Sequence, residues 1–326
     1  MNDDHDLQDL QDLHDGNPAH EAGSVYDGLL GGEPGQGDGH WAFGTSFEDP
    51  LAGVDTTVPA GVDGAGLAAY CLMLGDDALV LSQRLTEWCS NAPDLEEDIA
   101  LANIALDLLG QARLLLARAA AADGSVVPAL PEGSPVPAED ALAFFRDAAA
   151  FRNVRLVEAP IGDFAVTVTR LLVFAAWRLA LLQHLAGSRD AVVAAVAAKG
   201  VKEVTYHRDY AARWFVTLAR GTAESRRRTE AALMAVWPAV PELFDTHEVE
   251  QQMAAAGVGV DPTSVRADVE QVLDHVLQAA GLERPEVAGM SGVRGCAGRD
   301  GLHTEALGHL LAEMQSVARA HPLGVW

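Results

Sequence analysis

Cysteine is scarce in this chain, and its few copies exclude two kinds of protein. Among 326 residues only Cys71, Cys89 and Cys296 occur, widely spaced and without any Cys-x-x-Cys pair. A disulfide-stabilised fold needs a larger, even set of cysteines, and a thiolate zinc site needs closely spaced pairs. We therefore expect neither, and we expect a reducing, cytoplasmic location.

Basic residues are also few, which argues against a nucleic-acid partner. The chain has 22 Lys and Arg against 47 Asp and Glu, giving a net charge of −25. Proteins bind phosphate backbones through a basic face, and the sequence shows no such face. Residues 1–66 contain fourteen acids, thirteen glycines and no Lys or Arg. This composition predicts a disordered acidic, glycine-rich tail before a folded domain at 67–326.

The sequence shows neither an export signal nor an uninterrupted membrane span. The chain starts Met-Asn-Asp-Asp-His-Asp, without the basic and apolar regions of a signal peptide. The apolar run at residues 171–182 is interrupted by Arg178, whereas a membrane span needs about 20 residues with few or no charges. We expect neither export nor membrane insertion.

Strand signals are scarce after residue 67, where apolar residues recur at helical spacing. Long helices are expected at 70–89, 94–122, 163–185 and 190–220, and shorter ones at 139–149, 223–243, 262–280 and 304–320. Four long helices with one long crossover between the second and the third are the plan of a ferritin-like bundle. The predicted fold is therefore all-α, a ferritin-like four-helix bundle with additional C-terminal helices in one domain.

Histidine and acidic residues are missing at two places where a di-iron bundle needs them. Such bundles take one Glu from each of two helices and a Glu-x-x-His pair from each of the other two. No histidine occurs between His40 and His184, so the second long helix has none. No acid occurs between Asp163 and Asp190, so the third long helix has none inside it. Two obligatory ligands are therefore absent.

What remains of such a site is four vestigial positions: Glu87, Asp107, Glu203 and His207. Three acids and one imidazole could hold a single iron or manganese ion. Buried carboxylates without partners are costly, however, and four basic residues lie near enough in sequence to pair with them, namely Arg84, Arg113, Lys199 and Lys202. We expect salt bridges in place of a metal, and we assign no catalytic residue to this chain.

A polar row marks the second long helix. Asn103, Asp107 and Gln111 recur every four residues along an otherwise apolar stretch. Polar side chains inside a bundle need hydrogen-bond partners, so this row predicts a buried network. A remnant of a metal site is the alternative interpretation.

Several long motifs resemble one protein family. They are residues 81–88 (LSQRLTEW), 100–113 (ALANIALDLLGQAR), 244–245 (FD) and 301–315 (GLHTEALGHLLAEMQ). These motifs resemble the C subunits of bacterial phenylacetyl-CoA epoxidases, in register over about residues 67–326. The acidic tail lies outside the resemblance.

The resemblance implies a non-catalytic role in phenylacetate catabolism. In that family the C subunit lacks iron ligands and stabilises the related A subunit, which holds the di-iron centre, in a dimer of heterodimers. A reductase subunit with FAD and an iron–sulfur cluster supplies electrons from NADPH. The complex epoxidises the ring of phenylacetyl-CoA, so the implied cofactors lie in the partners and none in this chain.

The resemblance also implies two substrate-binding segments near the acyl-CoA. They fall on Ala150, Phe151, Arg152 and Asn153, and on Gln251, Gln252 and Met253. Ala150 replaces a glutamine of the family, and the second segment is polar where its relatives are apolar. The rigid donor fork of Arg152 could suit a CoA phosphate or carbonyl, and a solvated loop arginine is the alternative.

Three functional classes therefore remain open from the sequence. The first is a scaffold subunit that stabilises a catalytic partner. The second is a self-sufficient metal-dependent oxygenase or oxidase that uses the four vestigial positions. The third is a helical adaptor of unrelated function.

Overall fold

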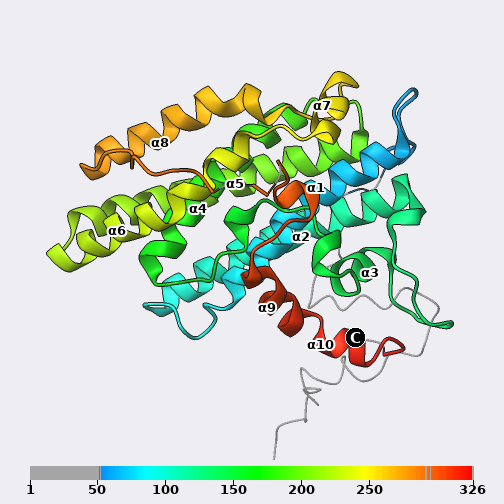
Figure 1. The fold of residues 1–326 in the computed structure, drawn as a ribbon, viewed down its shortest axis with the longest axis horizontal. Helices are drawn as coiled ribbons and strands as arrows, with labels where there is room; N and C mark the ends of the chain where they lie inside the picture. The colour runs from blue at the N-terminus through cyan, green and yellow to red at the C-terminus, as the bar shows by residue number, and fades with distance from the viewer. Residues whose placement is uncertain (1–50, 52, 291, 294, 325–326) are drawn as a thin grey trace, which may run out of the picture. The chain divides into compact units, whose positions relative to one another are not determined.

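The computed structural model describes residues 51, 53–290, 292–293 and 295–324, and the described part is built from helices (Figure 1). It contains no β-strand, only an isolated bridge between Val293 and Cys296. The predicted all-α class is confirmed. Residues 1–50, which hold most of the predicted acidic tail, lie outside the described residues.

Four long helices form the bundle: α1 (Gly64–Thr86), α2 (Leu95–Ala122), α4 (Phe164–Leu185) and α5 (Ala191–Arg220). Helix α1 packs mainly against α2, helix α4 packs mainly against α5, and α2 also contacts α5. The crossover between α2 and α4 carries the short helix α3 (Ala138–Phe144) and several 3-10 turns. The ferritin-like plan predicted from the sequence is therefore present.

Each of the four bundle helices begins with an aspartate. The side chains of Asp63, Asp94, Asp163 and Asp190 each accept a hydrogen bond from the backbone N–H three residues further on. An acid at this position satisfies a free N–H and interacts favourably with the helix dipole. These caps place the starts of α2, α4 and α5 within one residue of the predicted starts.

The start of α1 differs from the prediction by six residues. The glycine-rich composition of residues 1–66 assigned Gly64 to the tail, but Asp63 caps the helix there. A side chain at Gly64 would meet the carbonyl oxygen of Ala122 at 2.7 Å, so glycine permits a close approach to the end of α2. The predicted boundary at residue 66 therefore falls inside α1.

Residues just before α1 are also held in place, although their composition assigned them to the tail. Arg118 of α2 donates from Nη1 to the carbonyl of Thr56 at 2.6 Å and from Nη2 to that of Thr57 at 3.3 Å. The same guanidinium pairs with Asp190, and both side chains are buried. This pair therefore ties the segment before α1 to the end of α2 and the start of α5.

Five further helices extend the bundle: α6 (Ala223–Val236), α7 (Glu248–Ala255), α8 (Arg266–Ala280), α9 (Glu305–Met314) and α10 (Ser316–Ala320). Helix α8 packs along α4 and α5, whereas α9 contacts α1 (Figure 1). The sequence predicted one helix at 304–320 and the structure divides it into α9 and α10. Helix α7 was not predicted.

By length and composition alone, α1, α2 and α4 are apolar enough to cross a membrane. The apolar windows of α1 and α4 are 83% and 94% buried inside the described part, so the core accounts for their composition. Arg170 and Arg178 of α4 are fully buried within it. Only 44% of the α2 window is buried, so much of its apolar surface has no cover.

Candidate functional site

The structure brings three of the four vestigial positions to the contact between α2 and α5. His207 Nε2 lies 2.9 Å from Asp107 Oδ2, and Gln111 Nε2 donates to Glu203 Oε2 at 3.0 Å. Glu87 lies instead at the C-terminal end of α1, where Arg84 binds it at 2.7 Å. No group of three or more His, Cys, Asp or Glu in the described part of the chain is arranged to hold a metal ion.

Two of the four predicted basic partners bind the vestigial acids. Arg84 pairs with Glu87, and Lys199 pairs with Glu203 at 2.8 Å. Arg113 instead lies 3.6 Å from Glu139 on α3. The pairing of Lys202 with these acids, expected from sequence proximity, is wrong, because neighbouring residues such as Lys202 and Glu203 point to different sides of a helix.

The polar row on α2 is only partly buried. Gln111 is buried, Asp107 is half-buried, and Asn103 is exposed. The residues of the row are therefore more exposed towards the N-terminal end of α2. Gln111 and Asp107 have the hydrogen-bond partners that the prediction required, but only Gln111 is buried. The prediction is wrong for Asn103, because this side of α2 faces outward.

Helix α4, which lacks an acid, places an arginine at the centre of the bundle. Arg178 of α4 is fully buried, and its Nη2 donates to Gln111 Oε1 at 3.3 Å. Its Nε and Nη1 have no hydrogen-bond partner in the described part. Burial lowers the pKa of Arg178 to about 10, against the opposing effect of Asp77, so the group remains charged at neutral pH.

The polar chain Lys199–Glu203–Gln111–Arg178 therefore runs across α5, α2 and α4. Both ends of this chain are cations, and between them lie the carboxylate of Glu203 and the amide of Gln111, which face the bundle interior. A buried guanidinium repels a divalent cation strongly where the effective dielectric constant is low. These residues do not fit an iron or manganese centre.

Two acids of α1 hold the predicted substrate-binding loop. Asp76 pairs with Arg146 and accepts from the N–H of Arg152 at 2.8 Å. Asp77 pairs with Arg299 at 2.9 Å and accepts from the N–H of Val154 at 2.8 Å. The sequence signal for both was a pair of adjacent acids inside an apolar helix, which matches none of the motifs described above.

Within the first predicted segment, two of the four side chains are buried in the protein. Phe151 and Asn153 are fully buried, and the Arg146 guanidinium lies 4.2 Å from the centre of the Phe151 ring. Ala150 and Arg152 are half-buried. Arg152 Nη1 donates to the carbonyls of Ala149 and Phe151, each at 2.8 Å. Arg152 is thus the segment's polar group with access to solvent.

The second predicted segment lies on α7. Gln251 and Gln252 are exposed, whereas Met253 is 2% exposed and packs in the core. Arg299 joins the two segments, because its Nη1 donates to the carbonyl of Arg152 at 2.8 Å and its Nε lies 3.5 Å from Glu250 Oε1. The structure therefore brings the backbone of the first segment close to the start of α7.

A buried glutamate and a histidine complete the support of this loop. Glu158 Oε1 accepts from Asn153 Nδ2 at 3.0 Å and lies 2.6 Å from His303 Nδ1. Its Oε2 accepts from both the N–H and the hydroxyl of Thr304 at 2.7 Å. His303 Nε2 lies 3.0 Å from the carbonyl of Phe151, so it acts as the donor there. Glu158 was not predicted, since a single Glu in a loop gives no signal.

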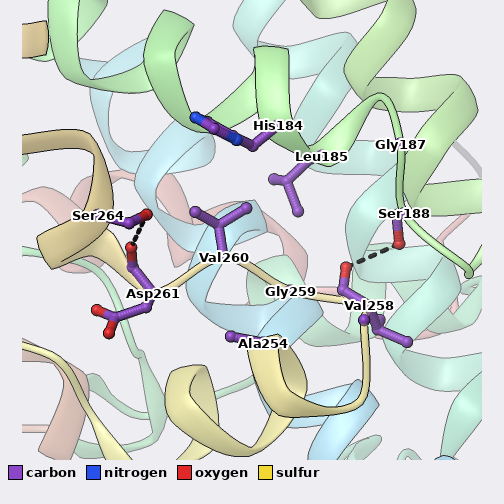
Figure 2. Close-up of a pocket in the computed structure, with 11 residues that line it drawn as sticks. His184, Leu185, Gly187, Ser188, Ala254, Val258, Gly259, Val260, Asp261 and Ser264 are labelled. Carbon is purple, nitrogen blue, oxygen red and sulfur yellow. Dashed lines mark hydrogen bonds between the residues drawn. The ribbon is translucent and has the colours of Figure 1, made fainter.

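A separate pocket of about 390 Å³ lies between the end of α4 and the segment after α7 (Figure 2). Ser188 Oγ donates across it to the carbonyl of Val258 at 2.7 Å. The N–H groups of Val258 and Gly259 bind the carbonyl of Met253, and that of Val260 binds the Tyr70 hydroxyl. These three N–H groups are already used inside the protein, and none of the seven predicted substrate-binding residues lines the pocket.

The fold and the site together define a ferritin-like helical bundle without a metal-ligand set in its described part. The chain belongs to the family described as "Phenylacetic acid catabolic protein", whose model matches residues 55–326. It is 44% identical over 261 residues to the C subunit of the 1,2-phenylacetyl-CoA epoxidase of Escherichia coli (strain K12). The match covers 80% of this chain and 99% of that relative. The resemblance inferred from the motifs is confirmed.

Proposed function

We propose that this chain is a non-catalytic structural subunit of a multicomponent phenylacetyl-CoA ring-1,2-epoxidase in aerobic phenylacetate catabolism. It stabilises a related catalytic A subunit that carries the di-iron centre, and the two assemble as a dimer of heterodimers. A reductase subunit with FAD and an iron–sulfur cluster delivers electrons from NADPH. The complex works in the cytoplasm.

One observation carries the non-catalytic role, namely the buried Arg178 at the centre of the bundle. The third long helix of a di-iron bundle supplies a carboxylate, whereas here α4 supplies a guanidinium that binds Gln111. The alternative of a self-sufficient oxygenase needs Glu87, Asp107, Glu203 and His207 in one site. Glu87 pairs with Arg84 at the end of α1 instead, which counts against this alternative.

The loop at 150–153 and the start of α7 support a contribution to the acyl-CoA site. Arg152 offers donors at the surface. Its N–H donates to Asp76, its carbonyl accepts from Arg299, and the neighbouring Asn153 donates to Glu158, so the loop around Arg152 is held in place. In this proposal Arg152 binds a CoA phosphate or carbonyl, and Gln251 and Gln252 lie at the edge of the same site. The buried Phe151, Asn153 and Met253 shape the site without touching the ligand.

Co-expression with the related A subunit from the same genome tests the assignment. We expect the two chains to co-purify, with iron in the complex and at most a trace in this chain alone, measured by plasma mass spectrometry. Phenylacetyl-CoA epoxidation should require the A subunit and the reductase. Stoichiometric iron in the isolated chain, together with turnover by that chain and the reductase, would refute the assignment.

A further inference from the structure

The outward face of α2 carries a row of exposed apolar side chains. Leu95, Ile99, Leu106 and Leu109 are 69%, 53%, 63% and 45% exposed, and they are spaced at helical intervals on one side of the helix. The fourteen steps from Leu95 to Leu109 correspond to about 21 Å at the rise of an α-helix. We call these four residues the α2 stripe. A contiguous apolar row of this length is typical of a protein–protein contact.

Helix α5 borders the α2 stripe. Tyr206, 46% exposed, contacts the rings of His207 and Tyr210. His207 binds Asp107, and the hydroxyl of Tyr210 binds Glu97, so Tyr206 lies beside the line along which α5 meets α2. A hollow of about 610 Å³ on α5 lies next to Tyr206. The lining of this hollow is mostly polar, so Tyr206 is the exposed aromatic residue that α5 adds beside the stripe.

The charge beside the stripe is unusual for this chain. Its two lysines, the only ones among 326 residues, are Lys199 and Lys202, and both are exposed on α5. Lys199 binds Glu203, which accepts from Gln111, so the lysines lie towards the Leu109 end of the stripe. The other end carries Glu96 and Asp98 in the first turn of α2. The face is therefore basic at one end and acidic at the other.

These charges favour a different subunit over a second copy of this chain. Two copies would each bring a net charge of −25, and like charges of that size repel at a distance. A partner with an apolar helix face and carboxylates opposite the lysines would complement this face at its centre and at its basic end. Complementary charge fixes orientation and raises the association rate.

We propose that the α2 stripe, with Tyr206 and the two lysines beside it, is the docking surface for the catalytic subunit of the proposed complex. The partner contributes an apolar helix face, and its carboxylates bind Lys199 and Lys202. This inference rests on the proposed function, because that function supplies the partner.

Two matched double variants test the surface. Leu106→Glu with Leu109→Glu places two charges in the stripe, whereas Met234→Glu with Val317→Glu places two charges at exposed apolar positions on α6 and α10. Each full-length variant is mixed with the purified A subunit, and the Kd is measured by interferometry. We expect the stripe variant to bind at least tenfold more weakly and the control within twofold of wild type, both with unchanged circular dichroism.

Zero-length carbodiimide crosslinking of the wild-type complex gives an independent readout. Because the chain has two lysines, the crosslinked peptides identify the contact directly, and we expect Lys202 to be joined to a carboxylate of the A subunit. Attachment of Lys202 to an acid of its own chain outside α5 would mean that an internal segment covers the face. A wild-type homodimer that the stripe variant dissociates would mean that a second copy covers it. Either of these two results would overturn the proposed docking surface.

The two proposals fail in different ways. If the wild-type chain and the A subunit do not associate, the proposed function is wrong. If they associate and the stripe variant binds as tightly as wild type, the docking surface is wrong while the function stands.

Discussion

Single buried side chains determine what this bundle can hold. Arg170 and Arg178 occupy α4, and their partners are carbonyl and amide oxygens, since Arg170 donates to Ala159 and Pro160 while Arg178 donates to Gln111. Within the described residues, neither arginine binds a carboxylate directly. Burial lowers the pKa of each to about 10, and both keep their charge at neutral pH. Helix α4 thus carries two buried guanidinium groups and no acid inside it, whereas the corresponding helix of a di-iron bundle supplies a carboxylate.

The three thiols should differ sharply in reactivity. Cys71 is fully buried, and burial raises the pKa of its thiol far above the usual range, with a further effect from Asp190. Cys89 and Cys296 are exposed. Because the thiolate is the reactive form, iodoacetamide at pH 8 should alkylate the two exposed cysteines and spare Cys71 in the native chain. Peptide mass spectrometry reads each site, and urea should render all three reactive. Rapid native labelling of Cys71 would contradict its burial.

At the scale of elements, aspartates set the beginnings of the helices and buried arginines tie them together. Arg118 and Asp190 join α2, the residue before α5 and the backbone at Thr56. Asp261 plays a similar part after α7, where its carboxylate accepts from Thr246 and Thr263. These contacts predict where the structure is sensitive to substitution.

Replacing Arg118 with leucine should destabilise the fold by about 3–5 kcal/mol, because it leaves the buried Asp190 charge without a partner. The free energy of unfolding in urea measures the loss. Arg227→Leu is the matched control, since Arg227 forms a solvent-exposed pair with Glu224 and such pairs contribute little to stability. Equal losses for the two variants would show that the Arg118 pair is not special.

Replacing Asp261 with alanine should cost roughly 1 kcal/mol, as for other lost helix caps, and the loss should depend on pH. Hydrogen bonds from Thr246 and Thr263 lower the pKa of Asp261. The carboxylate therefore stabilises the fold above its unfolded pKa of about 3.9, and this contribution disappears as the pH falls through the lower folded value. Urea unfolding of both proteins from pH 7 to pH 3 should show the difference shrinking at the acid end. A difference that grows on acidification would contradict the assignment.

At the scale of the whole molecule, Arg299 connects segments that are far apart in the chain. It donates to the carbonyls of Met73 and Arg152, pairs with Asp77, and approaches Glu250. The segment before α9 thereby holds α1, the 150–153 loop and α7 in one arrangement. Both predicted substrate-binding segments depend on this single guanidinium.

Arg299→Leu should therefore lower stability by about 3–5 kcal/mol, because Asp77 is left buried without its partner. Increased amide hydrogen exchange should appear at Arg152 and Val154 together, since Asp76 and Asp77 hold these two N–H groups. Exchange measured by mass spectrometry on peptides covering 146–157 tests this. Exchange that rises only near residue 299 would show that the segments are held independently.

The sequence predicted the bundle well and the site unevenly, for physical reasons. Helical periodicity and the caps at Asp94, Asp163 and Asp190 are local signals, so the helices they begin were placed closely. The start of α1 was misplaced because the glycine-rich composition assigned Gly64 to the tail, while its close approach to Ala122 depends on tertiary contact. Proximity in sequence predicted that Lys202 would pair with the site acids, but Lys202 lies on a different side of α5 and does not bind them.

The missing ligands were visible in the sequence, whereas the residues that replace them were not. An absent histidine or acid can be read directly, but Arg178 in an apolar helix gave no indication that it would meet Gln111 across the bundle. The same holds for Glu158 and His303, which are 145 positions apart and in contact. Partners of buried polar groups are set by topology, and only the three-dimensional structure identifies them.

The arginine at the bundle centre also limits how this protein could evolve. Iron binding in this bundle would need a carboxylate on α4, a histidine on α2 and removal of the Arg178 charge. Each change made singly leaves a buried polar group unpaired or adds no ligand, so each intermediate would lose stability without gaining chemistry. The internal guanidinium therefore opposes a stepwise introduction of iron ligands into this bundle.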